Sequence, residues 1–184
     1  MNDVWAIFSD KTATKVNMNL VVNDKLYFSP VAIDNSEVIK SAEKAITASI
    51  EYFESIGLNF PEKKCGIIFA FEGNDSVTGS SASLSFALKL VYKIKEYIED
   101  VQIPFSIAAT GIVDGINKEA HIIKVDYMNQ KIEAALKTLN PGDIIFFPID
   151  NVSEILKKNI ERCHQSGIKL QAVSTISDAV HKLL

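Results

Sequence analysis

Three serines stand in a small-residue loop that leads directly into an apolar, helix-like segment. The loop reads Gly79-Ser80-Ser81-Ala82-Ser83 and lies within the stretch EGNDSVTGSSASLSFALKL. Backbone N–H groups point outward where a loop enters a helix, so such a place can bind phosphate or the oxyanion of an acyl-transfer intermediate. A serine at this position can equally cap the helix. From the loop alone, all three interpretations stay open.

A nucleophilic serine needs a base to take its proton. The three histidines, His121, His164 and His181, belong to no recognisable triad motif. The other common base is a lysine whose pKa is lowered by burial. Lys131 is a candidate because it enters the small and apolar face of the segment Asp126–Leu139, although a solvated surface lysine fits the same spacing.

The elements that must position these residues follow from the spacing of apolar side chains. The expected strands are Val4–Phe8, Thr14–Val22, Leu26–Ile33, Cys65–Phe71, Phe105–Val113 and Ala120–Val125, with two more within PGDIIFFP and KLQAV. The expected helices run from a cap at Asn35 or Ser36 to Gly57, over Ser83–Ile98, over Asp126–Leu139, over Val152–Ser166, and from a cap at Ser174 or Thr175 onward.

This order of elements predicts the fold class. Strands come first and then alternate with helices, without a linker, repeat or low-complexity tract, so residues 1–184 are expected to form a single α/β domain. A hairpin turn is expected at Asn23-Asp24 between two apolar runs. The short apolar run Cys65–Phe71 is expected to be a central strand.

Composition restricts the partners and the compartment. A net charge of −4 argues against nucleic acid as a partner, because phosphate contacts need a basic surface. The chain has no apolar run long enough for a membrane span, and its N-terminus lacks the pattern of a signal peptide. We therefore expect a cytoplasmic protein. Cys65 and Cys163 are expected to be reduced structural thiols, and no metal or cofactor site is expected.

Several segments, taken in order, resemble the proteolytic domain of the Lon proteases. The loop stretch is similar to the serine motif of that family, and its Ser-Ala-Ser form is closest to that of the membrane-anchored B-type enzymes. IAATGIVD resembles the family's Ala-x-Thr-Gly strand end, NQKIEAAL its lysine helix, and IIFFPIDN its strand ending in Pro148 with Asn151 nearby. SEVIKSAEKAITASIEYFE and LQAVSTISDAVHKLL are similar to the long helix before the serine strand and to the closing strand and helix. The best match spans residues 36–184, after N-terminal strands in 1–33.

This resemblance implies a serine-type endopeptidase with a Ser-Lys dyad. Ser81 takes the position of the nucleophile and Lys131 that of the general base. Thr110 is implied to lie near the dyad and to orient the lysine, with Glu72 and Ala82 as further supporting residues. Backbone N–H groups at the start of the helix after the loop are the expected oxyanion donors.

The resemblance also carries expectations about fold and partners. It implies the Lon protease-domain fold, related to the ribosomal protein S5 domain 2-like superfamily. The chain contains no G-x-x-x-x-G-K-[ST] motif, so the expected substrates are unfolded polypeptides or polypeptides delivered by a separate ATPase. A homo-oligomeric ring, such as a hexamer, is expected. In place of the family's Gly-Gly pair before the lysine helix, this chain has Asp126-Tyr127.

Two other functions stay open at this point. The altered Asp126-Tyr127 pair is compatible with a catalytically inactive, Lon-like assembly module that partners another protein. The segment TGSSAS also resembles the phosphate loop of the galactokinase and homoserine kinase superfamily. The chain is short for those two-domain enzymes, and the sequence after Thr110 does not continue in their pattern.

Overall fold

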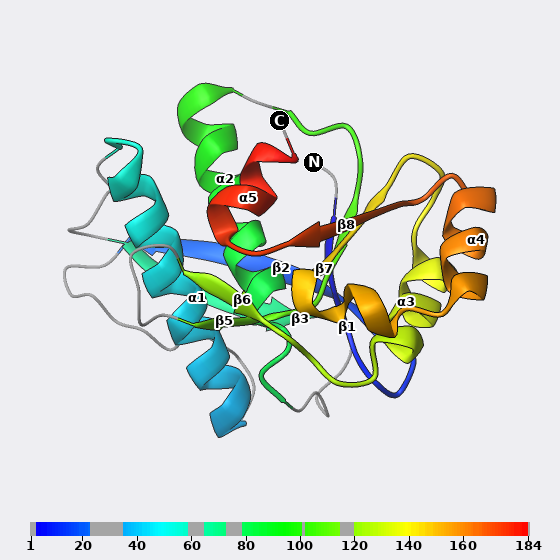
Figure 1. Cartoon of the computed structure of the whole chain (residues 1–184). Coiled ribbons are helices and arrows are strands. Elements are labelled where there is room, and N and C mark those ends of the chain that lie inside the picture. The colour runs from blue at the N-terminus through cyan, green and yellow to red at the C-terminus, as the bar shows by residue number, and fades with distance from the viewer. Residues whose placement is uncertain are drawn as a thin grey trace.

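The computed structural model describes residues 3–22, 35–58, 65–72, 79–100, 102–114 and 120–183. These residues form an α/β fold with a mixed six-stranded sheet, a two-stranded sheet and six helices, one of which is a 3-10 helix (Figure 1). The expected strand Leu26–Ile33 and the expected hairpin turn at Asn23-Asp24 lie outside the described residues. No helix within these ranges is both long and apolar enough to cross a membrane.

The six-stranded sheet has the order β3-β2-β1-β4-β7-β8. Its strands are β1 (Val4–Ile7), β2 (Ala13–Val22), β3 (Cys65–Phe71), β4 (Ile107–Ala109), β7 (Ile144–Pro148) and β8 (Lys169–Val173). β2 runs antiparallel to both β1 and β3, whereas β1, β4, β7 and β8 are parallel to one another. The parallel half places the carboxyl ends of β4 and β7 at the same edge of the sheet.

Among the described residues, Cys65–Phe71 does not take the central position expected of it. β3 lies at one end of the described sheet and pairs with β2. Ile67 and Phe69 are fully buried, while Ile68 and Ala70 are only partly covered. An apolar run shows that a strand is covered by other elements, but it does not give the strand's place in the sheet.

Helices cover both faces of the sheet (Figure 1). They are α1 (Ser36–Ser55), α2 (Ser83–Glu99), α3 (Met128–Thr138), η1 (Ile149–Glu154), α4 (Lys157–Gln165) and α5 (Ile176–His181). Side chains of α1, α2 and α5 form one core with the sheet, and side chains of α3 and α4 form a second core. Successive residues of β1 alternate between them, since Ala6 belongs to the first and Ile7 to the second.

Two of the expected helix caps are confirmed. The Asn35 side chain accepts hydrogen bonds from the N–H groups of Glu37 and Val38 at the start of α1. The Thr175 hydroxyl accepts one from the Asp178 N–H at the start of α5. Each cap satisfies N–H groups that have no partner within the helix itself.

The expected single helix Val152–Ser166 is wrong, because the chain breaks it into η1 and α4. Ile155 and Leu156 between them are extended, with ψ angles of 121° and 136°. The Leu156 N–H donates to Asn129 Oδ1 on α3 at 2.9 Å. Apolar spacing continues across the break, so periodicity could not reveal it.

The expected strand Phe105–Val113 is also interrupted, at Thr110-Gly111. After β4 the chain leaves the large sheet, and β5 (Ile112–Asp114) pairs antiparallel with β6 (His121–Ile123). A Cβ on Gly111 would lie 2.6 Å from Ile122 Cγ2, so the chain can pass this close to β6 only with glycine at position 111. The break brings residue 110 to the loop that precedes α2.

Candidate active site

Lys131 lies in the first turn of α3, and its side chain is only 4% exposed. The helix begins after Tyr127, whose φ of 58° is in the left-handed region that favours glycine. The Lys131 N–H donates to the Tyr127 carbonyl at 3.2 Å, so the first helical turn forms directly after this residue. The Asp126-Tyr127 pair therefore adopts a backbone conformation that still directs the Lys131 side chain into the protein interior.

The Lys131 ammonium is hydrogen-bonded to the Thr110 hydroxyl. Its Nζ donates to Thr110 Oγ1 at 3.1 Å, and Thr110 Oγ1 donates to the Ser81 carbonyl at 3.4 Å. Thr110 is fully buried just beyond β4, and its N–H donates to the Phe146 carbonyl on β7. The hydroxyl thus joins the lysine helix to the serine loop at the carboxyl edge of the sheet.

Burial lowers the pKa of Lys131 from 10.5 to about 8. Removing the ammonium from water disfavours its charged form, and only the Asp126 carboxylate opposes this effect by favouring the charge. No carboxylate forms an ion pair with Lys131 within the described ranges. Near pH 8 about half of the amine is therefore neutral, which is the form that a general base requires.

Ser81 is held by its backbone while its hydroxyl is free. Its carbonyl accepts the Gly111 N–H at 2.9 Å in addition to the Thr110 hydroxyl. The side chain is partly exposed, and its Oγ has no hydrogen-bond partner among the residues that the structure describes. Lys131 donates to Thr110 Oγ1 and not to Ser81, so in the described structure the amine and the Ser81 hydroxyl are linked only through Thr110 and the Ser81 carbonyl.

Ser83 has a structural position and is not available as a nucleophile. It is 1% exposed, and its Oγ donates to the Gly111 carbonyl at 2.9 Å and accepts from the Val113 N–H at 2.7 Å. These bonds tie β5 to the start of α2. Ser80 is partly exposed, and its carbonyl accepts from the Ser83 N–H at 3.3 Å.

The first N–H groups of α2, which are the expected oxyanion donors, are already occupied. Ser83 N–H donates to Ser80, and Leu84 N–H donates to the Gly111 carbonyl at 3.1 Å. The N–H groups of Ser81 and Ala82 have no acceptor among the described residues. The free donors at this loop are therefore those of Ser81 and Ala82, directly before α2, and not those at the start of the helix.

The structure does not bring Glu72 to this cluster. Glu72 is exposed, forms an ion pair with Lys15 Nζ at 3.7 Å and donates its N–H to the Lys15 carbonyl. Lys15 pairs with Trp5 of β1, which pairs with Ala108 of β4. Glu72 is thus separated from β4 by three strand spacings, or roughly 14 Å.

No histidine is hydrogen-bonded to Ser81 among the described residues. His121, His164 and His181 are exposed, and His181 bonds to Ser177 within α5. Within the described part of the chain, no three His, Cys, Asp or Glu side chains are placed to hold a metal ion. Cys163 is buried, which raises the pKa of its thiol to about 11 and keeps it protonated.

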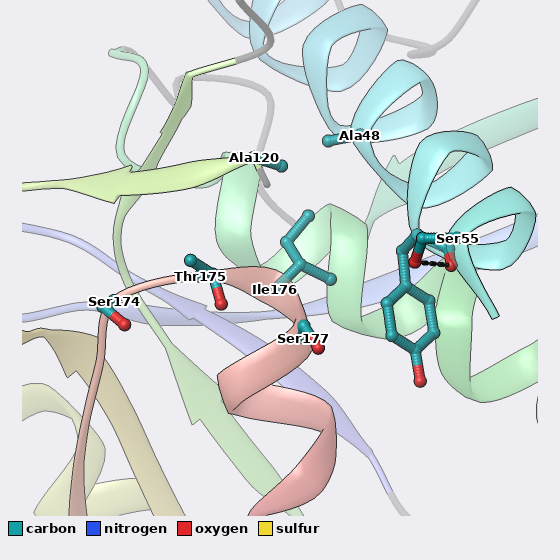
Figure 2. Close-up of a pocket in the computed structure, with 8 residues that line it drawn as sticks. Ala48, Ser55, Ala120, Ser174, Thr175, Ile176 and Ser177 are labelled. Carbon is teal, nitrogen blue, oxygen red and sulfur yellow. Dashed lines mark hydrogen bonds between the residues drawn. The ribbon is translucent and has the colours of Figure 1, made fainter. Parts of the chain in front are cut away.

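A separate cavity of about 450 Å³ lies between α1 and α5 (Figure 2). Its lining is mainly small and hydroxyl-bearing and comprises Ala48, Tyr52, Ser55, Ala120, Ser174, Thr175, Ile176 and Ser177. Ser81, Thr110 and Lys131 do not line it, so it is distinct from the Ser81–Thr110–Lys131 cluster.

Sequence reasoning assigned no role to three asparagines that hold the start of α3. Asn151 and Asn159 are fully buried, and both belong to hydrogen-bond networks that reach residues 125–129. Asn129 itself bonds to η1 and to the start of α4. Asn151 belongs to the motif IIFFPIDN, which gave it no role, and the only sequence signal for Asn129 and Asn159 is a polar residue within an apolar pattern, which is equally typical of a surface position.

Models of known protein families give no match to this chain, and neither do the curated proteins that were searched.

Proposed function

We propose that this chain is a serine peptidase with a Lon-type proteolytic fold, in which Ser81 is the nucleophile and Lys131 the general base. One observation carries the proposal. A buried lysine with a lowered pKa donates to a threonine hydroxyl, and that hydroxyl donates to the carbonyl of a serine whose own Oγ is free. The order of motifs along the chain supports the same assignment.

In the proposed reaction, neutral Lys131 takes the proton from Ser81 Oγ as that oxygen attacks a peptide carbonyl carbon. The oxyanion is stabilised by backbone N–H groups, for which Ser81 and Ala82 have free donors. When the C–N bond breaks, protonated Lys131 gives its proton to the leaving amine. Water then attacks the acyl-enzyme, with Lys131 again as base, and releases the acid and free Ser81.

The proposed substrates are unfolded polypeptides or polypeptides delivered by a separate ATPase, and the proposed assembly is a homo-oligomeric ring. These parts of the proposal rest on the resemblance of the motifs. The dyad itself rests on the burial and hydrogen bonds of Lys131 and Thr110.

A fluorophosphonate probe and a fluorogenic peptide together test the dyad. The wild type should label at Ser81, and the rate should rise with pH through about 8 as Lys131 loses its proton. Ser81→Ala should abolish labelling and hydrolysis, whereas Ser80→Ala, which removes the neighbouring hydroxyl, should retain both. Equal hydrolysis by the wild type and Ser81→Ala would show that the assignment is wrong. A ring-sized assembly without labelling would favour the inactive assembly module.

A further inference from the structure

We propose that Asn151 is a positioning residue for Lys131, acting through the backbone of Val125 and the start of α3. The inference rests on the proposed function, in which Lys131 is the general base. Asn151 lies in η1, three residues after the end of β7, and its side chain is fully buried. A buried amide needs hydrogen-bond partners for both its oxygen and its nitrogen.

Asn151 bonds to both backbone groups of a single residue. Its Oδ1 accepts from the Val125 N–H at 3.0 Å, and its Nδ2 donates to the Val125 carbonyl at 2.8 Å. Val125 is buried between β6 and α3 and belongs to neither of the described sheets. The amide side chain therefore takes the place of a strand partner and fixes this peptide on η1.

The second Nδ2 proton of Asn151 extends this attachment by one residue. It donates to Glu154 Oε2 at 2.8 Å, and the other oxygen of Glu154 pairs with Lys124 Nζ at 2.5 Å. Lys124 and Val125, the last residues before Asp126-Tyr127, are thus both fastened to η1.

Asn129 fastens α3 on the other side of its start. Its Oδ1 accepts from the Leu156 N–H and from Asn159 Nδ2, both at 2.9 Å. Its Nδ2 donates to the Glu154 carbonyl at 2.9 Å. Residues 124–129 are therefore held at both ends, and Lys131 follows only two residues after Asn129.

The hydrogen bonds of Asn151 and Asn129 to residues 124–129, η1 and α4 form a clamp on the start of α3. This clamp matters because Lys131 must reach Thr110 Oγ1 at 3.1 Å from the first turn of α3. Asn151 has no hydrogen bond to Lys131, Thr110 or Ser81 in the described structure, so its effect passes through the backbone. A displacement of about 1 Å at a reacting group can lower a rate about 100-fold. Loss of the clamp should also admit water to the amine.

A pH titration of lysine 13Cε signals by NMR tests the clamp without any catalytic readout. The Lys131 signal is assigned as the one missing in Lys131→Met. In Asn151→Ala its titration midpoint should move up by about one pH unit, because a hydrated amine is more basic. Ser49→Ala is the matched control, since it removes a buried hydrogen bond within α1 and should leave the midpoint unchanged. An unchanged midpoint in folded Asn151→Ala overturns the proposal.

Asn151→Ser serves as a second variant if Asn151→Ala does not fold, and the same midpoint decides. Labelling by the fluorophosphonate should fall about 100-fold in either Asn151 variant, with the pH profile moved upward, whereas Ser49→Ala should keep the wild-type profile. A wild type that does not label at all would overturn the proposed function only, because the lysine titration still decides the clamp. A wild type that labels, with an unmoved midpoint in both Asn151 variants, would overturn the clamp only.

Discussion

Replacing Lys131 with methionine should stabilise the fold at pH 7 while it removes the general base. Lysine and methionine have similar length, and methionine has no charge to desolvate. Burial lowers the pKa of Lys131 from 10.5 to about 8, so below pH 8 the folded protein contains an ammonium held in an unfavourable environment. That difference corresponds to about 3 kcal/mol of unfolding free energy. Loss of the hydrogen bond to Thr110 offsets about 1 kcal/mol, which leaves a gain of about 2 kcal/mol.

The stability gain of Lys131→Met should decrease as the pH rises through about 8. Below pH 8 both the folded and the unfolded chain carry the proton on Lys131, and the destabilisation is full. Between pH 8 and 10.5 the unfolded chain binds more protons than the folded one, so the contribution of Lys131 to stability rises with pH. Methionine does not titrate, so the advantage of Lys131→Met should shrink across this window. Near pH 10.5 only the lost Thr110 bond remains, and the sign should reverse.

Urea denaturation of the wild type and Lys131→Met at pH 7 and pH 10 measures this difference. All other titrating groups are common to both proteins, so the change in the difference reports Lys131 alone. Lys137→Met, at an exposed position in the last turn of the same helix, is the control and should show no comparable gain. A lower unfolding free energy for Lys131→Met at pH 7, or a difference that does not change with pH, would refute the reasoning.

Two further predictions concern the residues that join the serine loop to α3. Thr110→Val keeps the shape of the buried side chain but removes the acceptor of Lys131, so fluorophosphonate labelling should slow about tenfold; Thr110→Ser should label close to the wild-type rate, and equal rates for all three proteins would exclude a role for the hydroxyl. Gly111→Ala would place a Cβ 2.6 Å from Ile122 Cγ2 and 3.2 Å from Leu84 Cδ2, so the free energy of unfolding should fall by about 1 to 3 kcal/mol; an unchanged urea midpoint would contradict this close approach.

Much of the local structure was predictable because it depends on neighbouring residues. The cap at Asn35 and the cap at Thr175 use side chains within three residues of the N–H groups that they bind. The helix expected over Ser83–Ile98 agrees with α2 to within one residue, since its apolar face repeats at helical spacing. The α/β class followed from the order of these elements. The interpretation of Ser81 as nucleophile and Lys131 as base came from the order of motifs and stays a prediction.

The tertiary structure decided what surrounds these two residues. Lys131 meets Thr110 across 21 residues, Thr110 meets the Ser81 carbonyl across 29, and Asn151 meets Val125 across 26. Bonds between residues so far apart leave no local pattern, because each side chain alone fits a solvated surface equally well. The breaks in the expected strand and helix have the same origin, since at both a distant residue supplies the hydrogen bonds that regular structure would have made. The sequence by itself supplied a lysine at helical spacing, and its burial and lowered pKa arise only because the tertiary structure packs α3 against the sheet and η1 and places Thr110 at the lysine.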